Sequence, residues 1–328
     1  MKGLRARLSK AGIKPKFLNE VILPDWWEDS IASSDAGFRE AVGYIGSHLG
    51  LSLRSLLDED ALPTFAKSSK VLYKKTAGIT NDEVNLATQY ALGVARSVAG
   101  VFSEKEPAQE VPEPKSWRED LLQISDQPWV CLRHILATSW ELGIPVVQLR
   151  NFPAGAKKPD ALATMVDGRP VIVILNQRTS PSWIAFIVAH ELGHIHHKHL
   201  KAGQTLVDQK VSGDAVENEE KEANDFAVRL LTGHSDLGLN TTHRMNARLL
   251  AKACQSFGEK NRIAPGVAAL NYGFTTKEWA LSSGALSILE KKDDASEEMK
   301  SCLLAMLDSE DLSEEAWGLV SRSTGIDG

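Results

Sequence analysis

The chain has 328 residues, of which 43% are hydrophobic, and a formal net charge of −6. This length allows two or three domains with a buried core, and the negative charge argues against a nucleic-acid footprint spread over the whole molecule. No segment is apolar enough to span a membrane, residues 1–5 lack the apolar run of a signal peptide, and the cysteines are few and far apart, so we expect a soluble cytoplasmic protein.

The N-terminal region, residues 1–102, has the pattern of several short helices, of which residues 35–49 and 82–99 are the clearest. Residues 38–52 resemble the end of a repressor-type helix-turn-helix. They lack the cluster of basic and amide side chains that a recognition helix carries. A degenerate helix-turn-helix and a plain helical docking domain are therefore both open interpretations, and direct DNA binding is undecided.

Residues 103–116 are rich in proline and glutamate, a composition that buries little apolar surface. We interpret them as a linker. It separates the N-terminal region from a domain at residues 117–232, and a helical C-terminal region with an acidic tail follows at residues 233–328.

The domain after the linker combines a helix with a small sheet. Residues 117–142 are predicted to be helical, with leucine, isoleucine and valine facing the core. Alternating and β-branched residues then predict strands at residues 146–150, 161–166 and 171–176. The dipeptide Asp167-Gly168 predicts a tight turn between the last two.

The most specific motif is the pentapeptide His-Glu-Leu-Gly-His, which begins at His190. His190 and His194 are one helical turn apart, so both imidazoles leave the same face of a helix and can bind one zinc ion. Glu191 is then suited to act as general base toward a water at the metal, which is the chemistry of a metallopeptidase. Ser180 as N-cap and Pro181 at the first helical position predict where this helix begins.

A zinc hydrolase takes three protein ligands and leaves one coordination position open. Residues 219–231 predict a second helix, with an apolar stripe formed by Ala223, Phe226, Ala227, Leu230 and Leu231. Of its glutamates, Glu220 shares the face of this stripe, whereas Glu219 and Glu222 are expected to turn toward solvent. We choose Glu220 as the third ligand. Asn224, one turn later, is expected to hydrogen-bond a ligating histidine without itself binding the metal.

Other residues near these motifs have weaker assignments. The histidines that extend the first helix are interpreted as solvated imidazoles at its C-terminal end: His196, His197 and His199. The oxyanion formed during amide hydrolysis usually needs a further donor. His234 and Tyr272 are candidates, but the spacing selects neither.

The C-terminal region returns to helical patterns, most clearly at residues 245–257 and 276–289. Residues 293–315 contain many carboxylates around a few leucines. We interpret this acidic segment as an amphipathic helix on a solvated surface, and a regulatory tail is the other interpretation.

The two motifs together are similar to those of the ImmA/IrrE family of metallopeptidases. The family pattern E-x-x-A-N-x-F-A begins at Glu220 and fits without a gap, and the resemblance covers residues 117–232. Many members continue with methionine and proline after the double leucine, where this chain has Thr232 and Gly233. The resemblance implies the same ligands and base as the spacing, with Zn²⁺ as cofactor.

The resemblance also implies a fold and a function. The fold would be α+β, a mostly helical chain with a zincin-like domain containing a small sheet, flanked by helical regions. The function would be cleavage of a specific intracellular protein, typically a transcriptional repressor in a stress-response or mobile-element (defence) switch. The alternative is a non-proteolytic regulator, or an antitoxin-like protein, that binds a partner or DNA. Glu191 favours hydrolysis, because pure binding needs no base beside an open metal site.

Overall fold

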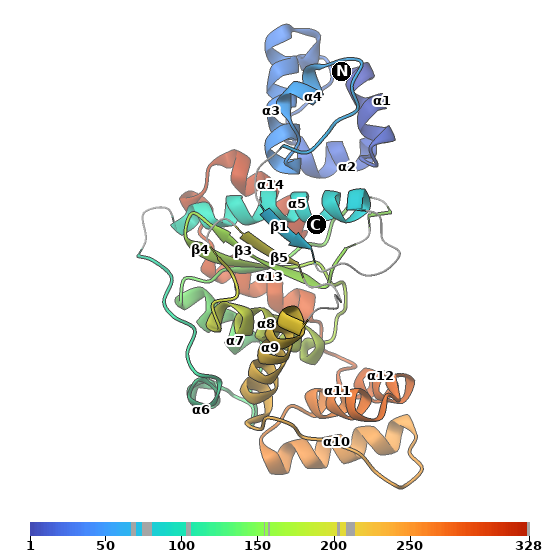
Figure 1. Ribbon diagram of the computed structural model, residues 1–328, viewed down its shortest axis with the longest axis vertical. Helices are drawn as coiled ribbons and strands as arrows, with labels where there is room; N and C mark the ends of the chain where they lie inside the picture. The colour runs from blue at the N-terminus through green and yellow to red at the C-terminus, as the bar shows by residue number, and fades with distance from the viewer. Residues whose placement is uncertain are drawn as a thin grey trace.

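Figure 1 shows a computed structural model of the chain. It describes residues 1–66, 70–73, 81–102, 106–153, 155–156, 158–201, 204–207 and 214–326. The fold is α+β and mostly helical, with one small mixed sheet at its centre, which confirms the expected fold class. Within the described residues, no helix combines the length and the apolar character that crossing a membrane requires.

The sheet has five strands in the order β1-β5-β3-β4-β2. The strands are β1 (Lys70–Tyr73), β2 (Val146–Gln148), β3 (Ala161–Val166), β4 (Arg169–Ile174) and β5 (Gln204–Val207). β3 and β4 form the predicted antiparallel hairpin, and its turn residues Asp167 and Gly168 have φ of 48° and 84°. β2 pairs with β4 in parallel, and β1 pairs with β5 in parallel. β1 and β5 were not predicted, because four residues are too few to show a clear alternation.

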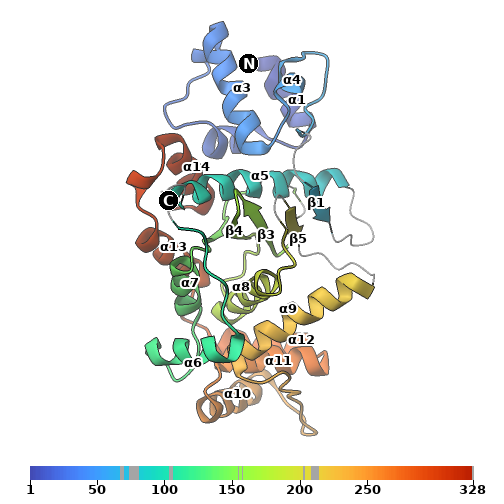
Figure 2. The ribbon, with the colours of Figure 1, turned by 60° about the vertical axis from the view of Figure 1, so that its left-hand side comes forward.

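Helices cover both faces of the sheet, so its interior strand β4 is buried on both sides. Val171 and Val173 of β4 face a core shared with α5 (Asn81–Ala99), whereas Ile172 and Ile174 face a core shared with α8 (Pro181–His196). Figure 2 shows α5 and α8 on opposite sides of the strands. A strand that is buried on both faces reads as a continuous apolar run, as residues 171–175 do.

The N-terminal helices form a small bundle on the outer side of α5 (Figure 1). They are α1 (Lys2–Lys10), α2 (Pro15–Phe17), the π-helix Leu18–Ile22, the 3₁₀ turn Ile31–Ser33, α3 (Asp35–Leu49) and α4 (Leu53–Leu57). α3 coincides with the predicted helix, and Ser34 caps it by accepting a hydrogen bond from Gly37 N at 3.1 Å. The proposed N-terminal region, residues 1–102, therefore includes both this bundle and α5, and α5 packs on the sheet.

The proline-rich segment interpreted as a linker is held against the domain from residue 106 onward. Gln109 N donates to Leu142 O at 2.8 Å, and the side chain of Val111 is buried. Glu113 caps α6 (Pro114–Ile124) by accepting from the backbone N–H groups of Lys115 and Ser116. Backbone and capping hydrogen bonds, rather than extensive apolar burial, fix this segment. Composition reports apolar content, so it could not predict that the segment is held in place.

The helix predicted at residues 117–142 is wrong as a single element. It is two helices, α6 and α7 (Leu132–Glu141), separated by a loop in which Ser125 Oγ donates to Trp129 O at 2.8 Å. Pro128 lies in this loop, and its missing N–H and its ring prevent a helix from running through.

The C-terminal region divides between two places. α10 (Ala247–Asn261), α11 (Pro265–Thr276) and α12 (Trp279–Leu289) pack around their own small core, at the end of the molecule opposite to the N-terminal bundle (Figure 1). The chain then returns to the other end of the molecule through α13 (Ala295–Met306), the 3₁₀ turn Ser309–Asp311 and α14 (Glu314–Thr324). α13 packs against α7 and β2, and α14 packs against α5. Within the acidic segment, residues 295–306 form a helix, as expected, and one side of it is buried against the rest of the molecule. Leu303 and Leu307 lie four residues apart on its inner face and are 2% and 4% exposed.

One buried histidine lies where the N-terminal bundle meets α14. His48 of α3 donates from Nδ1 to Ile22 O at 3.1 Å, and its Nε2 lies 3.3 Å from a carboxylate oxygen of Glu315. Burial lowers the pKa of His48 from 6.5 to about 4. The folded protein therefore holds this imidazole neutral at physiological pH.

This shift predicts a loss of stability in acid. Between pH 6.5 and about 4 the unfolded chain protonates His48 more readily than the folded chain does, so stability that is present above pH 6.5 is lost as the pH falls through this range. The contribution of this pKa shift to the free energy of unfolding should fall by about 2 kcal/mol from pH 7 to pH 5. Urea unfolding of wild type and His48→Gln at both pH values measures it. The variant should lose less stability on acidification, and an equal loss in both proteins would contradict the assignment.

Candidate metal centre

α8 carries the pentapeptide and begins where the sequence predicts. Ser180 is its N-cap, with Oγ accepting from Trp183 N at 3.2 Å, and Pro181 is its first residue. Its C-terminal half is almost completely inaccessible to solvent, with His190, Glu191 and His194 at 5%, 1% and 2% exposed. The motif therefore lies inside the domain, on a helix held against the sheet.

α9 (Asp214–Thr232) packs directly against α8. A Cβ atom added at Gly193 would lie 2.9 Å from Ala223 Cα and 3.0 Å from Phe226 Cβ, so only glycine permits this approach. The predicted apolar stripe of α9 is buried at this contact. Glu220 lies one turn before Ala223, and the close approach brings it beside the two histidines.

Three side chains meet where the helices touch. The Nε2 atoms of His190 and His194 are 3.2 Å apart, and carboxylate oxygens of Glu220 lie 3.2 Å from His194 Nε2 and 3.5 Å from His190 Nε2. Zinc bonds of about 2.0–2.1 Å in a tetrahedron place ligand atoms about 3.3–3.4 Å apart. The two nitrogens and the carboxylate therefore have the chemistry and the spacing of three zinc ligands.

Asn224 lies one turn after Glu220, and its Oδ1 is 3.2 Å from His190 Nδ1. An amide oxygen can only accept a hydrogen bond, so His190 Nδ1 donates and carries the ring proton. The Nε2 atom of neutral His190 then presents its lone pair to the cluster.

The two residues considered as oxyanion donors are not brought to this cluster. His234 is exposed and follows the end of α9, which lies about 18 Å along the helix axis from Glu220. Tyr272 is buried in the core of α10–α12, and its hydroxyl donates to Glu278 Oε2 at 2.5 Å. Both were chosen because they follow the ligand helix in sequence, and order along the chain does not determine distance in the fold.

Sequence reasoning missed two residues that are brought here. His199 Nδ1 is 2.9 Å from His194 Nδ1, and His199 Nε2 is 2.9 Å from Glu222 Oε2. His199 was expected to be solvated, yet only 8% of its side chain is exposed. Glu222 was expected to turn toward solvent, and its side chain is 42% exposed although it contacts His199. The position of His199 depends on the backbone, because Lys198 has a positive φ of 59° and turns the chain back after the helix. A lysine in this conformation is rare enough that the sequence gave no indication.

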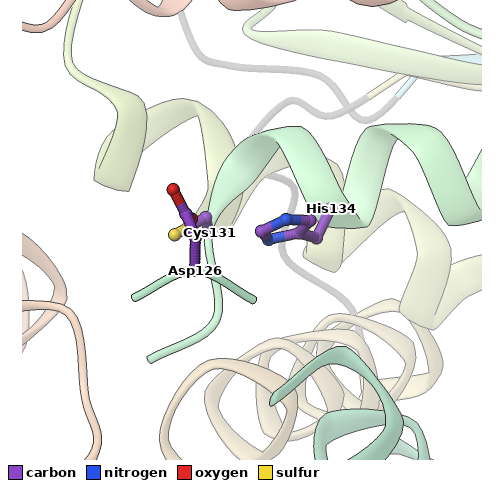
Figure 3. Close-up of side chains that lie close together, drawn as sticks. All are labelled: Asp126, Cys131 and His134. Atoms are coloured by element: carbon purple, nitrogen blue, oxygen red, sulfur yellow. The ribbon is translucent and has the colours of Figure 1, made fainter. Parts of the chain in front are cut away.

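A second group of ligand-type side chains lies at the start of α7, formed by Asp126, Cys131 and His134 (Figure 3). Arg133 donates to the Asp126 carboxylate, and this contact lowers the pKa of Asp126. Burial raises the pKa of the Cys131 thiol. A metal would have to displace Arg133 from Asp126 and ionise the Cys131 thiol, whose thiolate form is disfavoured by burial. The His190, His194 and Glu220 group is therefore the better candidate site.

The contact at Gly193 gives a stability prediction. Gly193→Ala should lower the free energy of unfolding by about 1–3 kcal/mol, because the added methyl meets backbone atoms of α9. Gly43→Ala in α3 is the matched control. Apart from the backbone of its own helix and its chain neighbours, no atom lies within 4 Å of its added Cβ, so Gly43→Ala should stabilise the protein by about 0.5–1 kcal/mol. Urea unfolding of both variants checks this, and a neutral Gly193→Ala would show that the two helices can move apart freely.

Comparison with known proteins gives one family match. A family model described as Peptidase U49 matches residues 136–266, a segment that begins in α7, includes α8 and α9 and ends in α11. No curated protein matches the chain. The match supports a peptidase of the ImmA/IrrE kind in the part of the chain that carries the three converging side chains.

Proposed function

We propose that this protein is a zinc-dependent endopeptidase that cleaves a specific intracellular protein, a transcriptional repressor in a stress-response or mobile-element switch. The observation that carries the proposal is the spacing of the His190, His194 and Glu220 ligand atoms, 3.2–3.5 Å apart, on two helices that cannot separate without losing a buried contact. The family match to peptidases over the same segment supports it.

The residues divide into a ligand set and a base. His190, His194 and Glu220 would hold the metal, and Asn224 would orient His190 through its Nδ1–H. When bound, zinc would acidify a water molecule and polarise the substrate carbonyl. Glu191 would accept the proton of the attacking water and deliver it to the leaving amide nitrogen. Its 1% exposure keeps this carboxylate out of bulk solvent, where a proton would otherwise exchange freely.

The ligand set has one side that faces solvent. The Glu220 side chain is 26% exposed, whereas those of His190 and His194 are 7% and 2% exposed. A peptide would therefore approach from the Glu220 side, between α8 and the N-terminal half of α9. We place the open coordination position on this side.

A specific protein substrate fits the position of the N-terminal bundle. It lies beyond α5, on the opposite side of the sheet from α8, so it does not cover the ligand set (Figure 2). A helical module held apart from the ligands is suited to docking a partner, and we assign residues 1–66 that role. Cleavage of a repressor recognised in this way, in the cytoplasm, is the proposed outcome.

Replacement of the base separates hydrolysis from metal binding. Glu191→Gln should retain one zinc per chain and the wild-type fold, but slow cleavage by at least about 100-fold, since a general base contributes 10²–10⁴-fold. Glu220→Gln should lose zinc, and Glu219→Gln should retain both properties. Metal content by plasma mass spectrometry and cleavage of co-expressed repressors encoded near this protein measure the two effects.

Two results would overturn the proposal. One is wild-type protein that takes up no zinc when metal is supplied in excess. The other is a Glu191→Gln variant that still performs the biological function, which would favour the non-proteolytic regulator.

A further inference from the structure

We propose that His199 and Glu222 form a hydrogen-bonded relay that orients the zinc ligand His194 and fixes its tautomer. The inference rests on the proposed zinc site and adds two positioning residues to it. Neither belongs to the ligand set or to the base, and both lie on segments packed against the ligands.

The end of α8 places His199 beside His194. His199 N donates to His194 O at 3.0 Å and Lys198 N donates to Ile195 O at 3.0 Å, while Lys198 has φ of 59°. This is the Schellman arrangement of a helix C-terminus, in which the second residue after the cap packs against the residue five positions earlier. The usual contact at that point is apolar. Here it is a hydrogen bond between two imidazoles, 2.9 Å from Nδ1 to Nδ1.

α9 supplies the third member of the relay. Glu222 lies two residues after Glu220, and its Oε2 is 2.9 Å from His199 Nε2. Its other oxygen accepts from Asn218 Nδ2 at 3.2 Å. The carboxylate is therefore held at both oxygens. The same helix thus provides a ligand to one side of the site and the end of the relay to the other.

The Glu222 carboxylate determines the direction of each hydrogen bond in the relay, first at His199 and then at His194. An ionised carboxylate only accepts, so His199 Nε2 carries the ring proton and donates it to Glu222. In the relay His199 carries its single ring proton on Nε2, so its Nδ1 atom accepts and His194 Nδ1 donates. This leaves His194 Nε2 with its lone pair directed toward His190 Nε2 and Glu220, as a zinc ligand requires.

The two ligating histidines are therefore supported differently. His190 donates to a neutral amide oxygen, whereas His194 donates through a second imidazole to a carboxylate. A carboxylate behind a ligating histidine raises the basicity of the ligand, and loss of such outer contacts typically costs 10–100-fold in metal affinity. We expect the relay to contribute an effect of that size.

Zinc affinity, measured by competition with a chromophoric chelator, tests the relay without relying on activity. His199→Ala should weaken zinc binding about 10–100-fold, and Glu222→Gln should weaken it less, because the amide can still accept a hydrogen bond. Glu217→Gln is the charge-matched control, an exposed glutamate on the same helix. His197→Ala is the control for the helix end, since His197 is exposed and packs against the ring of His199, with centroids 5.5 Å apart, as well as against the rings of His196 and Phe226. Both controls should bind zinc as wild type does.

A conservative variant separates orientation from general stability. The side-chain oxygen of His199→Asn can accept from His194 Nδ1 but cannot reach Glu222. It should bind zinc more tightly than His199→Ala and more weakly than wild type. In the His199→Asn background, Glu222→Gln should cause no further loss, because the link is already broken. Thermal unfolding of the metal-free variants, followed in parallel, shows whether affinity falls independently of the fold.

The outcomes distinguish this inference from the function on which it rests. Wild type that binds no zinc overturns the proposed function. Wild type that binds one zinc while His199→Ala, His199→Asn and Glu222→Gln bind it equally well overturns the relay alone. Additive losses from His199→Asn and Glu222→Gln would also overturn it, since independent residues would then account for the effect. If His199→Ala fails to fold, the other two variants decide.

Discussion

The contact between α8 and α9 at Gly193 is the constraint on which the site depends. The ligands come from two helices between which β5 lies in the chain, and their atoms must meet within a few tenths of an ångström of tetrahedral spacing. Gly193 and Ala223 allow the two backbones to approach so closely that no side chain fits between them. The small residues inside the two motifs thus have a physical role, which is to set the distance between the residues that carry the chemistry.

The helices of the site were predictable because their signals are local. Ser180 and Pro181 determine the start of α8, the apolar stripe of α9 identifies its inner face, and the four-residue spacing of the histidines determines which atoms share a face. Glu220 follows from the stripe alone. The hairpin of β3 and β4 was predictable for the same reason, since Asp167 and Gly168 supply the positive φ that its turn requires.

The remaining features depend on tertiary contacts that no local pattern contains. α5 reads as part of the N-terminal region, yet it covers the sheet. The acidic segment reads as a surface element, yet its Leu303 and Leu307 are buried in the core that α5 shares with the sheet. His199 and Glu222 look like solvated charges because their partners are each other and His194. A polar side chain held by hydrogen bonds to its neighbours has the same sequence signature as one that contacts only water. Sequence reasoning therefore finds ligands more readily than the residues that support them.

The arrangement of α9 suggests why its N-terminal half is so acidic. Glu220 and Glu222 are two residues apart, so they leave the helix in different directions, one toward the ligand atoms and the other toward His199. A rotation or shift of α9 would disturb the ligand and the relay together, because both are carried by one rigid element whose position is fixed at Gly193. The precision of the site is therefore a property of the interface between the two helices. We expect that interface, more than any single ligand, to tolerate the least change.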